Sequence, residues 1–284
     1  TGAVPGQWGW LTYSQNTQSN SFFTIVNETG RGKVLDISTG LTSAESLLAF
    51  KTNLSPLINN RNTGNDVLMF EIDYYTGSKH ATNTAGNTSR IVIAGNDGNV
   101  LTYPTATNLA VVVLEKTVGK FSAHPFVSNN TAIGEYIPFN TWIKFVFYLD
   151  YTNRKVYFEI PYLNKVFAND FLKNETSTNL IQDFAPNSIL LRVGVESGIN
   201  EPQIYTRNRY DNIKITALAQ VPPTIVTLST NEQLSAKFNI YPNPAINVVT
   251  ITNNENMAVQ QVTVYDISGK QLSMQSFNNE AEIQ

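Results

Sequence analysis

Residues Thr141–Ile160 read T-W-I-K-F-V-F-Y-L-D-Y-T-N-R-K-V-Y-F-E-I, and this stretch decides the fold. It contains two β-type runs, Trp142–Asp150 and Lys155–Ile160, separated by the turn Tyr151-Thr152-Asn153-Arg154. Alternate positions of the first run are apolar, namely Ile143, Phe145, Phe147 and Leu149. Because successive side chains of a strand point to opposite faces, the pattern predicts an antiparallel hairpin with one face in a core.

The same alternation recurs along the chain. In the predicted strand Val67–Tyr75, Leu68, Phe70, Ile72 and Tyr74 share one face and Met69, Glu71, Asp73 and Tyr75 share the other. Further strands are predicted at Phe22–Val26, Lys33–Ile37, Leu47–Lys51, Ser89–Ala94, Val100–Tyr103, Leu109–Glu115, Lys120–Val127, Ile189–Glu196 and Tyr210–Leu218. Gln7–Tyr13 fits either an edge strand or a leader that packs its tryptophan rings on the body. Leu41–Phe50 also fits a helical period, and Leu54–Asn65 and Phe167–Phe184 fit loops. The pattern predicts an all-β, antiparallel two-sheet sandwich over residues 1–218.

Residues 219–236 show no core pattern and contain Pro222-Pro223. Proline stiffens such a segment, so an extended linker is predicted between domain 1–218 and a small domain 237–284. In Tyr241-Pro242-Asn243-Pro244 each proline fixes φ and lacks an N–H, which predicts a stiff turn. Strands follow at Val248–Thr252, Gln261–Ile267 and Gln271–Ser276, with a turn at Ser268-Gly269.

This C-terminal segment resembles the C-terminal sorting domain of the type IX secretion system of Bacteroidetes. The matching residues are Tyr241, Pro242, Asn243, Pro244, Val262, Val264, Tyr265, Asp266, Gly269 and Lys270. The resemblance implies a small Ig-like β-sandwich, the type IX machinery as partner, and a secreted or outer cell-surface protein. Family members continue with further strands where this chain reaches Ile283-Gln284, so a truncated, partial sandwich is expected.

Composition sets outer bounds on function. The 284 residues carry a formal net charge of −3, which gives no support to nucleic-acid binding. No apolar run approaches about 18 residues, so no membrane span is expected, and any export signal would already have been removed. The absence of cysteine excludes disulfides and thiol chemistry. The two histidines, His80 and His124, lie far apart, so a histidine-based metal site or triad is not expected.

The hairpin carries a second resemblance. N-T-W-I-K-F-V-F-Y-L-D from Asn140, with K-V-Y-F-E-I from Lys155, resembles the Trp-led hairpin of concanavalin A-like jelly rolls, the lectin/glucanase and laminin-G group. Y-D-N-I-K-I from Tyr210 resembles the closing strand of that group. The resemblance implies that residues 1–218 form a jelly roll.

One strand could carry catalysis. Glu71 and Asp73 match the start of the Glu-x-Asp-x-(x)-Glu motif that the resemblance implies for retaining glucanases. That chemistry needs two carboxyl groups about 5 Å apart. Tyr75 and Thr76 stand where the second glutamate would be, and neither can protonate a glycosidic oxygen as a carboxylic acid does. No catalytic residue is therefore assigned. The alternative to a catalytic site is an ordinary strand that carries Glu71 and Asp73 as polar residues on its solvated face.

The same face is predicted to bind a sugar. Tyr75 offers a ring for stacking, and Glu71 and Asp73 offer acceptors for hydroxyl groups. Arg192 and Glu196, on another predicted strand, would add a donor and an acceptor. Trp142 is interpreted as a structural ring at the start of its strand rather than as a sugar platform.

No cofactor is predicted beyond a structural calcium ion. The jelly-roll resemblance implies such a site at the closing strand, where Asp211 is placed for it with loop carbonyls. Calcium takes six to eight oxygen ligands and no Asp-rich loop is visible, so Asp211 as a turn residue is the alternative.

These observations favour a secreted or cell-surface, non-catalytic binding or adhesion protein whose partner is a glycan or another surface ligand. The alternatives are a glycoside hydrolase whose acid lies elsewhere in the sequence, and a purely structural surface protein.

Overall fold

The computed structural model describes residues 4–5, 9–14, 20–38, 47–77, 87–95, 108–117, 120–125, 135–170, 186–195, 207–235, 238–241, 250–253, 261–266, 270–277 and 282–283. The chain divides into two compact units, Thr1–Ile225 and Val226–Gln284. Each unit is described by itself.

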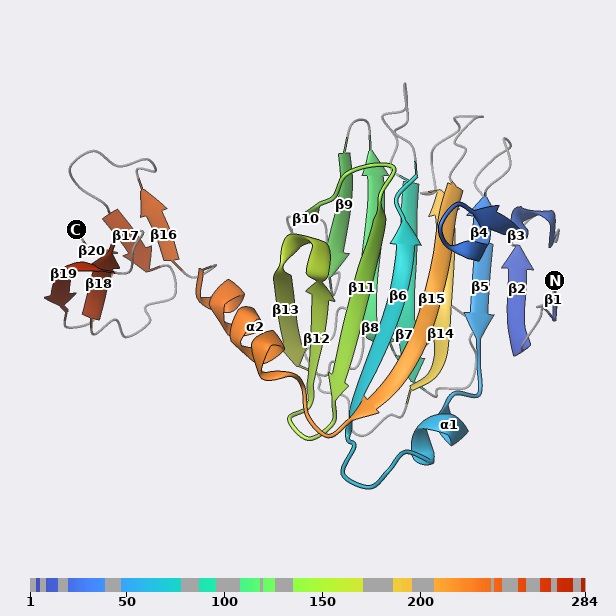
Figure 1. The fold of residues 1–284 in the computed structure, drawn as a ribbon, viewed down its shortest axis with the longest axis horizontal. Coiled ribbons are helices and arrows are strands. Elements are labelled where there is room, and N and C mark those ends of the chain that lie inside the picture. Colours follow the sequence, from blue (N-terminus) through green and yellow to red (C-terminus); the bar gives the residue numbers. More distant parts are fainter. Residues whose placement is uncertain are drawn as a thin grey trace. The chain divides into compact units, whose positions relative to one another are not determined.

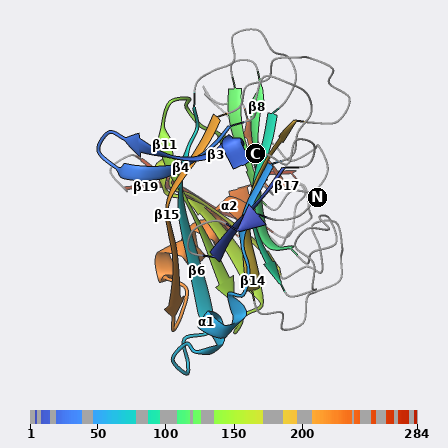
Figure 2. The same ribbon diagram turned by 90° about the vertical axis from the view of Figure 1, so that its right-hand side faces the viewer.

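The first unit contains an eight-stranded and a seven-stranded sheet, which form the two layers of a sandwich (Figures 1 and 2). The eight-stranded sheet has the order β1 (Val4–Pro5), β2 (Trp10–Ser14), β5 (Leu47–Lys51), β14 (Pro186–Val195), β7 (Asn87–Gly95), β8 (Asn108–Thr117), β9 (Lys120–Pro125) and β10 (Glu135–Tyr136). The seven-stranded sheet has the order β13 (Lys165–Asp170), β12 (Lys155–Ile160), β11 (Trp142–Asp150), β6 (Val67–Tyr75), β15 (Arg207–Leu218), β4 (Gly32–Ser38) and β3 (Phe23–Glu28).

The connections confirm the predicted antiparallel, jelly-roll-like sandwich. Neighbouring strands such as β11 and β6, β15 and β6, or β14 and β7 pair antiparallel. The chain changes sheet at each step from β4 to β5, β6 and β7, and again from β13 to β14 and β15. Short helices lie in the connections: η2 (Asn20–Phe22), α1 (Ser55–Asn59) and η3 (Pro161–Leu163).

Apolar side chains from the two sheets meet in one core. The seven-stranded sheet contributes Phe70, Ile72, Phe145, Phe147 and Phe158, and the eight-stranded sheet contributes Ile91, Ile93, Leu191 and Val193. One polar link crosses this core: the Asn208 Oδ1 accepts hydrogen bonds from the Tyr74 hydroxyl and, at 3.0 Å, from the Ser89 hydroxyl on the opposite sheet. The apolar faces predicted from alternation therefore point inward.

Most predicted strands lie where expected. Val67–Tyr75, Trp142–Asp150, Lys155–Ile160 and Leu47–Lys51 have the predicted bounds, so the helical alternative for residues 41–50 is wrong over β5. The predicted loop Leu54–Asn65 contains α1, and the predicted irregular segment Phe167–Phe184 begins within strand β13. The predicted strand Val100–Tyr103 lies outside the described residues.

The prediction of an extended linker over residues 219–236 is wrong. Helix α2 (Pro223–Ser235) occupies most of residues 219–236. Pro223 is its first residue, a position where a helix loses nothing from a missing N–H. Val221 and Ile225 are buried, so this segment carries a core pattern after all. None of the helices in the described ranges is long and apolar enough to span a membrane.

The second unit contains two small sheets. One has the order β16 (Phe238–Tyr241), β17 (Thr250–Asn253) and β20 (Glu282–Ile283), and the other pairs β18 (Gln261–Tyr265) with β19 (Gln271–Ser276). The Asp266 carboxylate accepts a hydrogen bond from the Lys270 amide at 3.0 Å, and the Asp266 amide donates to the Lys270 carbonyl at 2.9 Å. These bonds close the predicted turn. Residues 242–244 and Gly269 lie outside the described part, and an Ig-like arrangement stays a prediction.

Candidate functional site

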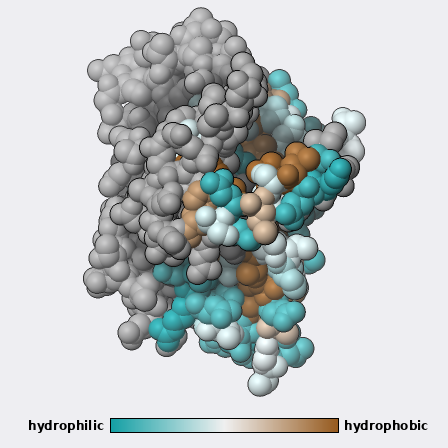
Figure 3. Space-filling model, turned by 90° about the vertical axis from the view of Figure 1, so that its left-hand side faces the viewer, coloured by the Kyte–Doolittle hydropathy of each residue, from teal (hydrophilic) through white to brown (hydrophobic). Residues whose placement is uncertain are grey.

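The hydropathy of the described surface does not mark one site. In Figure 3, hydrophobic residues form separate groups among hydrophilic ones on the described part of the face shown. Large exposed hydrophobic side chains of the first unit include Ile25, Leu57, Tyr136 and Tyr162, which come from different elements. Polar contacts are more informative.

The outward side of the seven-stranded sheet, here called the charged face, gathers the polar residues of three adjacent strands. Strand pairing puts Tyr75 opposite both Trp142 and Arg209, and Asp73 opposite both Lys144 and Asp211. Glu71 lies opposite Lys214 on β15. Because the core side chains of β6 alternate with these residues, all of them point away from the core.

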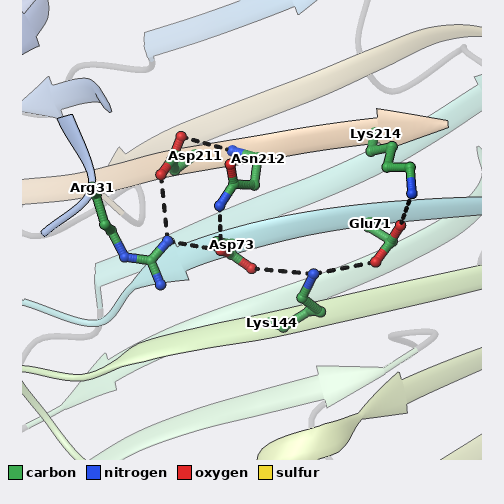
Figure 4. Close-up of polar contacts among 7 residues, drawn as sticks. All are labelled: Arg31, Glu71, Asp73, Lys144, Asp211, Asn212 and Lys214. Carbon is green, nitrogen blue, oxygen red and sulfur yellow. Dashed lines mark hydrogen bonds and ion pairs between the residues drawn. The ribbon is translucent and has the colours of Figure 1, made fainter. Parts of the chain in front are cut away.

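Arg31 pairs with two aspartates of the charged face, Asp73 and Asp211 (Figure 4). Its Nη1 lies 2.7 Å from Asp73 Oδ2 and 3.4 Å from Asp211 Oδ2. Asp73 Oδ2 also accepts a hydrogen bond from Asn212 Nδ2 at 2.9 Å. The Asp73 side chain is only 8% exposed, so a nearly buried carboxylate is held by a guanidinium and an amide.

Two lysines pair with the carboxylates of β6. Lys144 Nζ lies 3.2 Å from Glu71 Oε1 and 3.8 Å from Asp73 Oδ1. Lys214 Nζ lies 3.5 Å from Glu71 Oε2. Each carboxylate that the sequence singled out on β6 is therefore paired with at least one cation (Figure 4).

Two aromatic rings lie beside this network. The ring centroids of Tyr75 and Trp142 are 5.4 Å apart and tilted by 42°. The Arg31 guanidinium lies 4.1 Å from the Trp142 ring centroid, and the Arg209 guanidinium lies 5.6 Å from that of Tyr75. Cation–π contacts of this kind hold the arginines and rings in register.

Carboxylates from the sheet edge in turn hold Arg209. Its Nε lies 3.0 Å from Asp36 Oδ2, and its Nη1 bonds Glu28. Burial would lower the pKa of Arg209, but Asp36 and Glu28 raise it above the ordinary value, so the guanidinium stays charged.

Two backbone irregularities position the network. Gly30 and Gly32 flank Arg31 with φ of 78° and 83°, and this turn between β3 and β4 carries Arg31 over the charged face. The β3–β4 hairpin projects from the sandwich in Figure 2. In β15 a bulge between Asp211 and Lys214 adds one residue relative to β6, with Asn212 at φ 50°. The bulge lets both Asp211 and Lys214 face outward.

A further carboxyl lies two strands from Glu71. Val146 on β11 pairs with Glu71 on one side and with Glu159 on the other. The Tyr148 hydroxyl donates to Glu159 Oε2 at 2.9 Å. Burial raises the pKa of Glu159, the Tyr148 hydrogen bond opposes that change, and the charge of Glu71 adds to it. Burial, together with Glu159, also raises the pKa of Tyr148.

The structure brings together only part of the predicted ligand set. Glu71, Asp73 and Tyr75 share the charged face as predicted. Arg192 does not join them, because it lies on β14 of the other sheet and faces away from the core on that side. Glu196 lies outside the described residues.

Thr76, one candidate position for the missing glutamate, is fully buried. Its hydroxyl bonds the carbonyls of Pro138 and Thr141 at 2.9 and 3.1 Å and accepts from the Thr141 amide at 3.0 Å. Thr76 therefore fixes the segment before β11 and takes no part in the charged face.

Asp211 lies within strand β15 and pairs with Arg31. It is therefore part of the charged face, and the alternative interpretation of Asp211 as a turn residue is wrong. Within the described ranges, no group of three or more His, Cys, Asp or Glu residues is placed to hold a metal ion. Calcium at Asp211 stays a prediction.

The sequence reasoning missed several residues of the charged face, namely Arg31, Lys144, Arg209, Asn212 and Lys214. The alternation in Trp142–Asp150 already put Lys144 on the outward face of its strand, and the Gly30-Arg31-Gly32 triplet marks a tight turn. Neither pattern reveals which strands are neighbours, and that is what assembles the network.

Comparison with protein families identifies the C-terminal segment. Residues 239–284 match the model of the secretion system C-terminal sorting domain, which confirms the resemblance to the type IX sorting domain. A domain of this kind implies export to the cell surface or secretion. A comparison with curated proteins gives no match.

Comparison with solved structures gives weak likenesses. A carbohydrate esterase from the Shiga toxin-encoding bacteriophage phi24B shares 13% identity over 74% of this chain and 90% of its own, with a TM-score of 0.47. The globular domain of T. cruzi calreticulin shares 9% over 82% and 92%, with a TM-score of 0.42. An alginate lyase from a Chlorella virus shares 9% over 74% and 93%, with a TM-score of 0.41. Likenesses this weak carry no argument about binding or catalysis.

Proposed function

We propose that this protein is exported through its C-terminal sorting domain and that its first unit binds carbohydrate on the charged face without cleaving it. The observation that carries the proposal is the juxtaposition of the Tyr75 ring with the hydrogen-bonding groups of Asp211 and Arg209 on one outward surface. Sugars present apolar ring faces and hydroxyl groups, so a ring bordered by fixed donors and acceptors suits them.

The balance of charge favours a neutral sugar. The cations Arg31, Lys144, Arg209 and Lys214 are matched by the carboxylates Glu28, Asp36, Glu71, Asp73 and Asp211. A strongly anionic ligand would meet about as much repulsion as attraction here. Hydroxyl groups can instead accept from the guanidinium groups and donate to the carboxylates.

Trp142 supports this site indirectly. The Arg31 guanidinium lies 4.1 Å from the Trp142 ring centroid, closer than the 5.6 Å between the Arg209 guanidinium and the Tyr75 ring, so we assign Trp142 to holding Arg31 and bracing Tyr75. That assignment agrees with the interpretation of Trp142 as a structural ring.

Two features favour binding over hydrolysis. Glu71 and Asp73 are both engaged by cations, and the third carboxylate of the glucanase motif is replaced by Tyr75 and the buried Thr76. A hydrolase needs one carboxyl that delivers a proton and a second that acts as base or nucleophile.

One observation keeps a glycoside hydrolase as the second candidate. Glu159, whose pKa is raised, faces the same side as Glu71. Two strand spacings separate their backbones, roughly 10 Å, and inverting enzymes hold their two carboxyl groups about 6.5–9.5 Å apart. Against it, Val146 between them is only 4% exposed, so little room is left for a water and a sugar.

The test is a screen of the purified chain against immobilised neutral and acidic glycans, with an assay for new reducing ends on every glycan that is bound. We expect retention of at least one neutral glycan and no new reducing ends. Hydrolysis that is lost in Glu159→Gln and Glu71→Gln would replace the proposal by its alternative, and failure to retain any neutral glycan would refute it.

A further inference from the structure

An apolar pocket lies between helix α1 and the last residues of strand β15. Figures 1 and 2 show α1 at the end of the sandwich where β15 ends. The pocket has a volume of about 230 Å³, and apolar side chains from the α1 segment, β6 and β15 line it, namely Leu54, Leu57, Ile58, Leu68, Ile215 and Ala217. A cavity of about 150 Å³ with such a lining accepts benzene, so this pocket is large enough for a bulky apolar side chain.

The pocket is open to solvent. Leu57 is 68% exposed and Ile215 is 36% exposed, although both are large and apolar. Arg61, the polar residue of the lining, is held elsewhere, because its Nη2 lies 2.6 Å from Asp66 Oδ1 and its Nε donates to the Asn65 carbonyl at 3.0 Å. The pocket therefore suits an apolar group rather than an anion.

Strand β15 has an open edge beside this pocket. β4 pairs with it over Arg207–Tyr210, and among the described residues only β6 pairs with the rest of the strand. The bulge in β15 increases the local twist, and the β3–β4 hairpin projects from the sandwich (Figure 2). Near the end of β15 the Asn65 side chain donates to the Ala217 carbonyl at 3.5 Å, so the open stretch is residues 213–216.

An open strand edge presents main-chain hydrogen-bonding groups. Every second residue of an antiparallel edge strand directs its N–H and C=O away from the paired strand. These groups match the main chain of another extended segment, and strand addition to such an edge is a general mode of peptide recognition. The edge therefore specifies the kind of ligand that the pocket alone does not.

The side chains of this edge specify the ligand further. Ile213 and Ala217 pack against the main core and Ile215 lines the pocket, so all three point inward. Lys214 points outward, where its side chain is 66% exposed and its Nζ lies 3.5 Å from Glu71 Oε2. In an added strand, the residue directly opposite each of these has its Cβ about 5 Å away. The residue opposite Ile215 then reaches the pocket, and the residue opposite Lys214 lies beside a cation.

A second copy of the chain fits this edge poorly. Two identical edges pair antiparallel about a two-fold axis. With that axis inside residues 213–216, the two Lys214 side chains lie opposite or diagonal to each other. Like charges in neighbouring cross-strand positions are destabilising, so a segment of another protein is favoured.

We propose that the open edge of β15 and the adjoining pocket bind an extended peptide segment of another protein by strand addition. Apolar and polar residues alternate along this segment. An apolar side chain fills the pocket beside Leu57 and Ile215, and an acidic side chain pairs with Lys214. The proposal does not depend on sugar binding around Tyr75.

A phage-displayed library of random octapeptides, panned on the full chain, supplies the probe. We expect enriched peptides in which apolar residues alternate with polar ones and at least one polar residue is acidic. The most enriched peptide is labelled with fluorescein and titrated by fluorescence anisotropy. The variants are Leu57→Asp, which puts a charge at the mouth of the pocket, and Lys214→Gln. Ile25→Asp puts the same charge at a 60% exposed aliphatic side chain on β3 and serves as the control.

Leu57→Asp should weaken binding at least about tenfold, because the apolar side chain of the peptide then faces a charge. Lys214→Gln should weaken it about threefold, the worth of one cross-strand ion pair. Ile25→Asp should bind as wild type does. Thermal unfolding of each variant verifies that it is folded.

Methylation of the peptide amides tests strand addition on the wild-type chain, without any variant. Only every second N–H of an added strand donates to the edge. Two analogues that are methylated on the two alternating sets of amides should therefore differ at least tenfold in affinity. Equal affinities of the two analogues, wild-type affinity of a folded Leu57→Asp variant, or failure to enrich alternating peptides would overturn the proposal. A dimer in sedimentation that Leu57→Asp dissociates would overturn it too, because a second copy then occupies the edge.

Discussion

Asp73 is the residue on which the charged face depends most. It is nearly buried and is bound by Arg31, Lys144 and Asn212. A buried charge that loses its partner is costly, and removing the Asp73 charge would leave Arg31 with its longer ion pair to Asp211 and its contact with the Trp142 ring.

Asp73→Asn should therefore lower the free energy of unfolding by about 2 kcal/mol. Asp170→Asn is the matched control, since Asp170 pairs with Lys155 but is 59% exposed, and it should cost less than about 1 kcal/mol. Urea denaturation of the two variants measures both values. Equal losses would show that the network adds no more than a surface ion pair does.

Glu159 gives the charged face a pH dependence. Burial raises its pKa above the ordinary 4.5, so the folded state binds this proton more tightly than the unfolded state. Its contribution to stability is complete below about pH 4.5 and is lost as the pH rises through the folded pKa.

Glu159→Gln removes that titration. Relative to wild type, the variant should gain stability between about pH 4 and pH 7, measured by urea denaturation at both values. A difference that is constant with pH, or one that falls as the pH rises, would contradict the raised pKa.

Among the elements, β15 shapes the site through its bulge. Asn212 adopts φ 50° there and donates to Asp73. Asn212→Gly loses the hydrogen bond but tolerates the backbone, whereas Asn212→Ala loses the bond and adds strain of about 1 kcal/mol. Urea denaturation should therefore rank the variants wild type, Gly, Ala. Equal stability of the Gly and Ala variants would mean that the left-handed conformation is not required.

The sequence predicts the individual strands better than it predicts the sheet to which each strand belongs. Strands β6, β11 and β12 were predictable because each alternates strictly around a core face, and alternation also grouped Glu71, Asp73 and Tyr75. Arg192 was misplaced because alternation fixes the face of a strand but not the sheet to which the strand belongs. Helix α2 was missed because Pro222-Pro223 suggests a spacer, whereas proline is also well suited to the first position of a helix.

At the scale of the whole molecule, we propose that the two units serve different tasks. The sorting domain at residues 239–284 implies export, and the first unit carries the charged face. Domain bounds of 1–218, 219–236 and 237–284 remain a proposal, with helix α2 now occupying most of the middle segment.

Export should depend on the second unit alone. In a Bacteroidetes host, the chain carrying a periplasmic signal should reach the cell surface or the medium, and deletion of residues 237–284 should leave it folded in the periplasm. Alanines at Tyr241, Pro242, Asn243 and Pro244 should impair export in the same way. Fractionation with protease protection measures the outcome, and export that survives the deletion would contradict the assignment.

The most direct test of sugar binding on the charged face is calorimetric titration of the neutral glycan retained in the screen. Tyr75→Ala removes the ring at the centre of the proposed site, and Tyr162→Ala removes a 56% exposed ring of η3 as a control. We predict that Tyr75→Ala weakens binding by about 1 kcal/mol, roughly fivefold in Kd, while Tyr162→Ala binds as wild type does. Unchanged affinity of Tyr75→Ala, or an equal loss in both variants, would contradict the account.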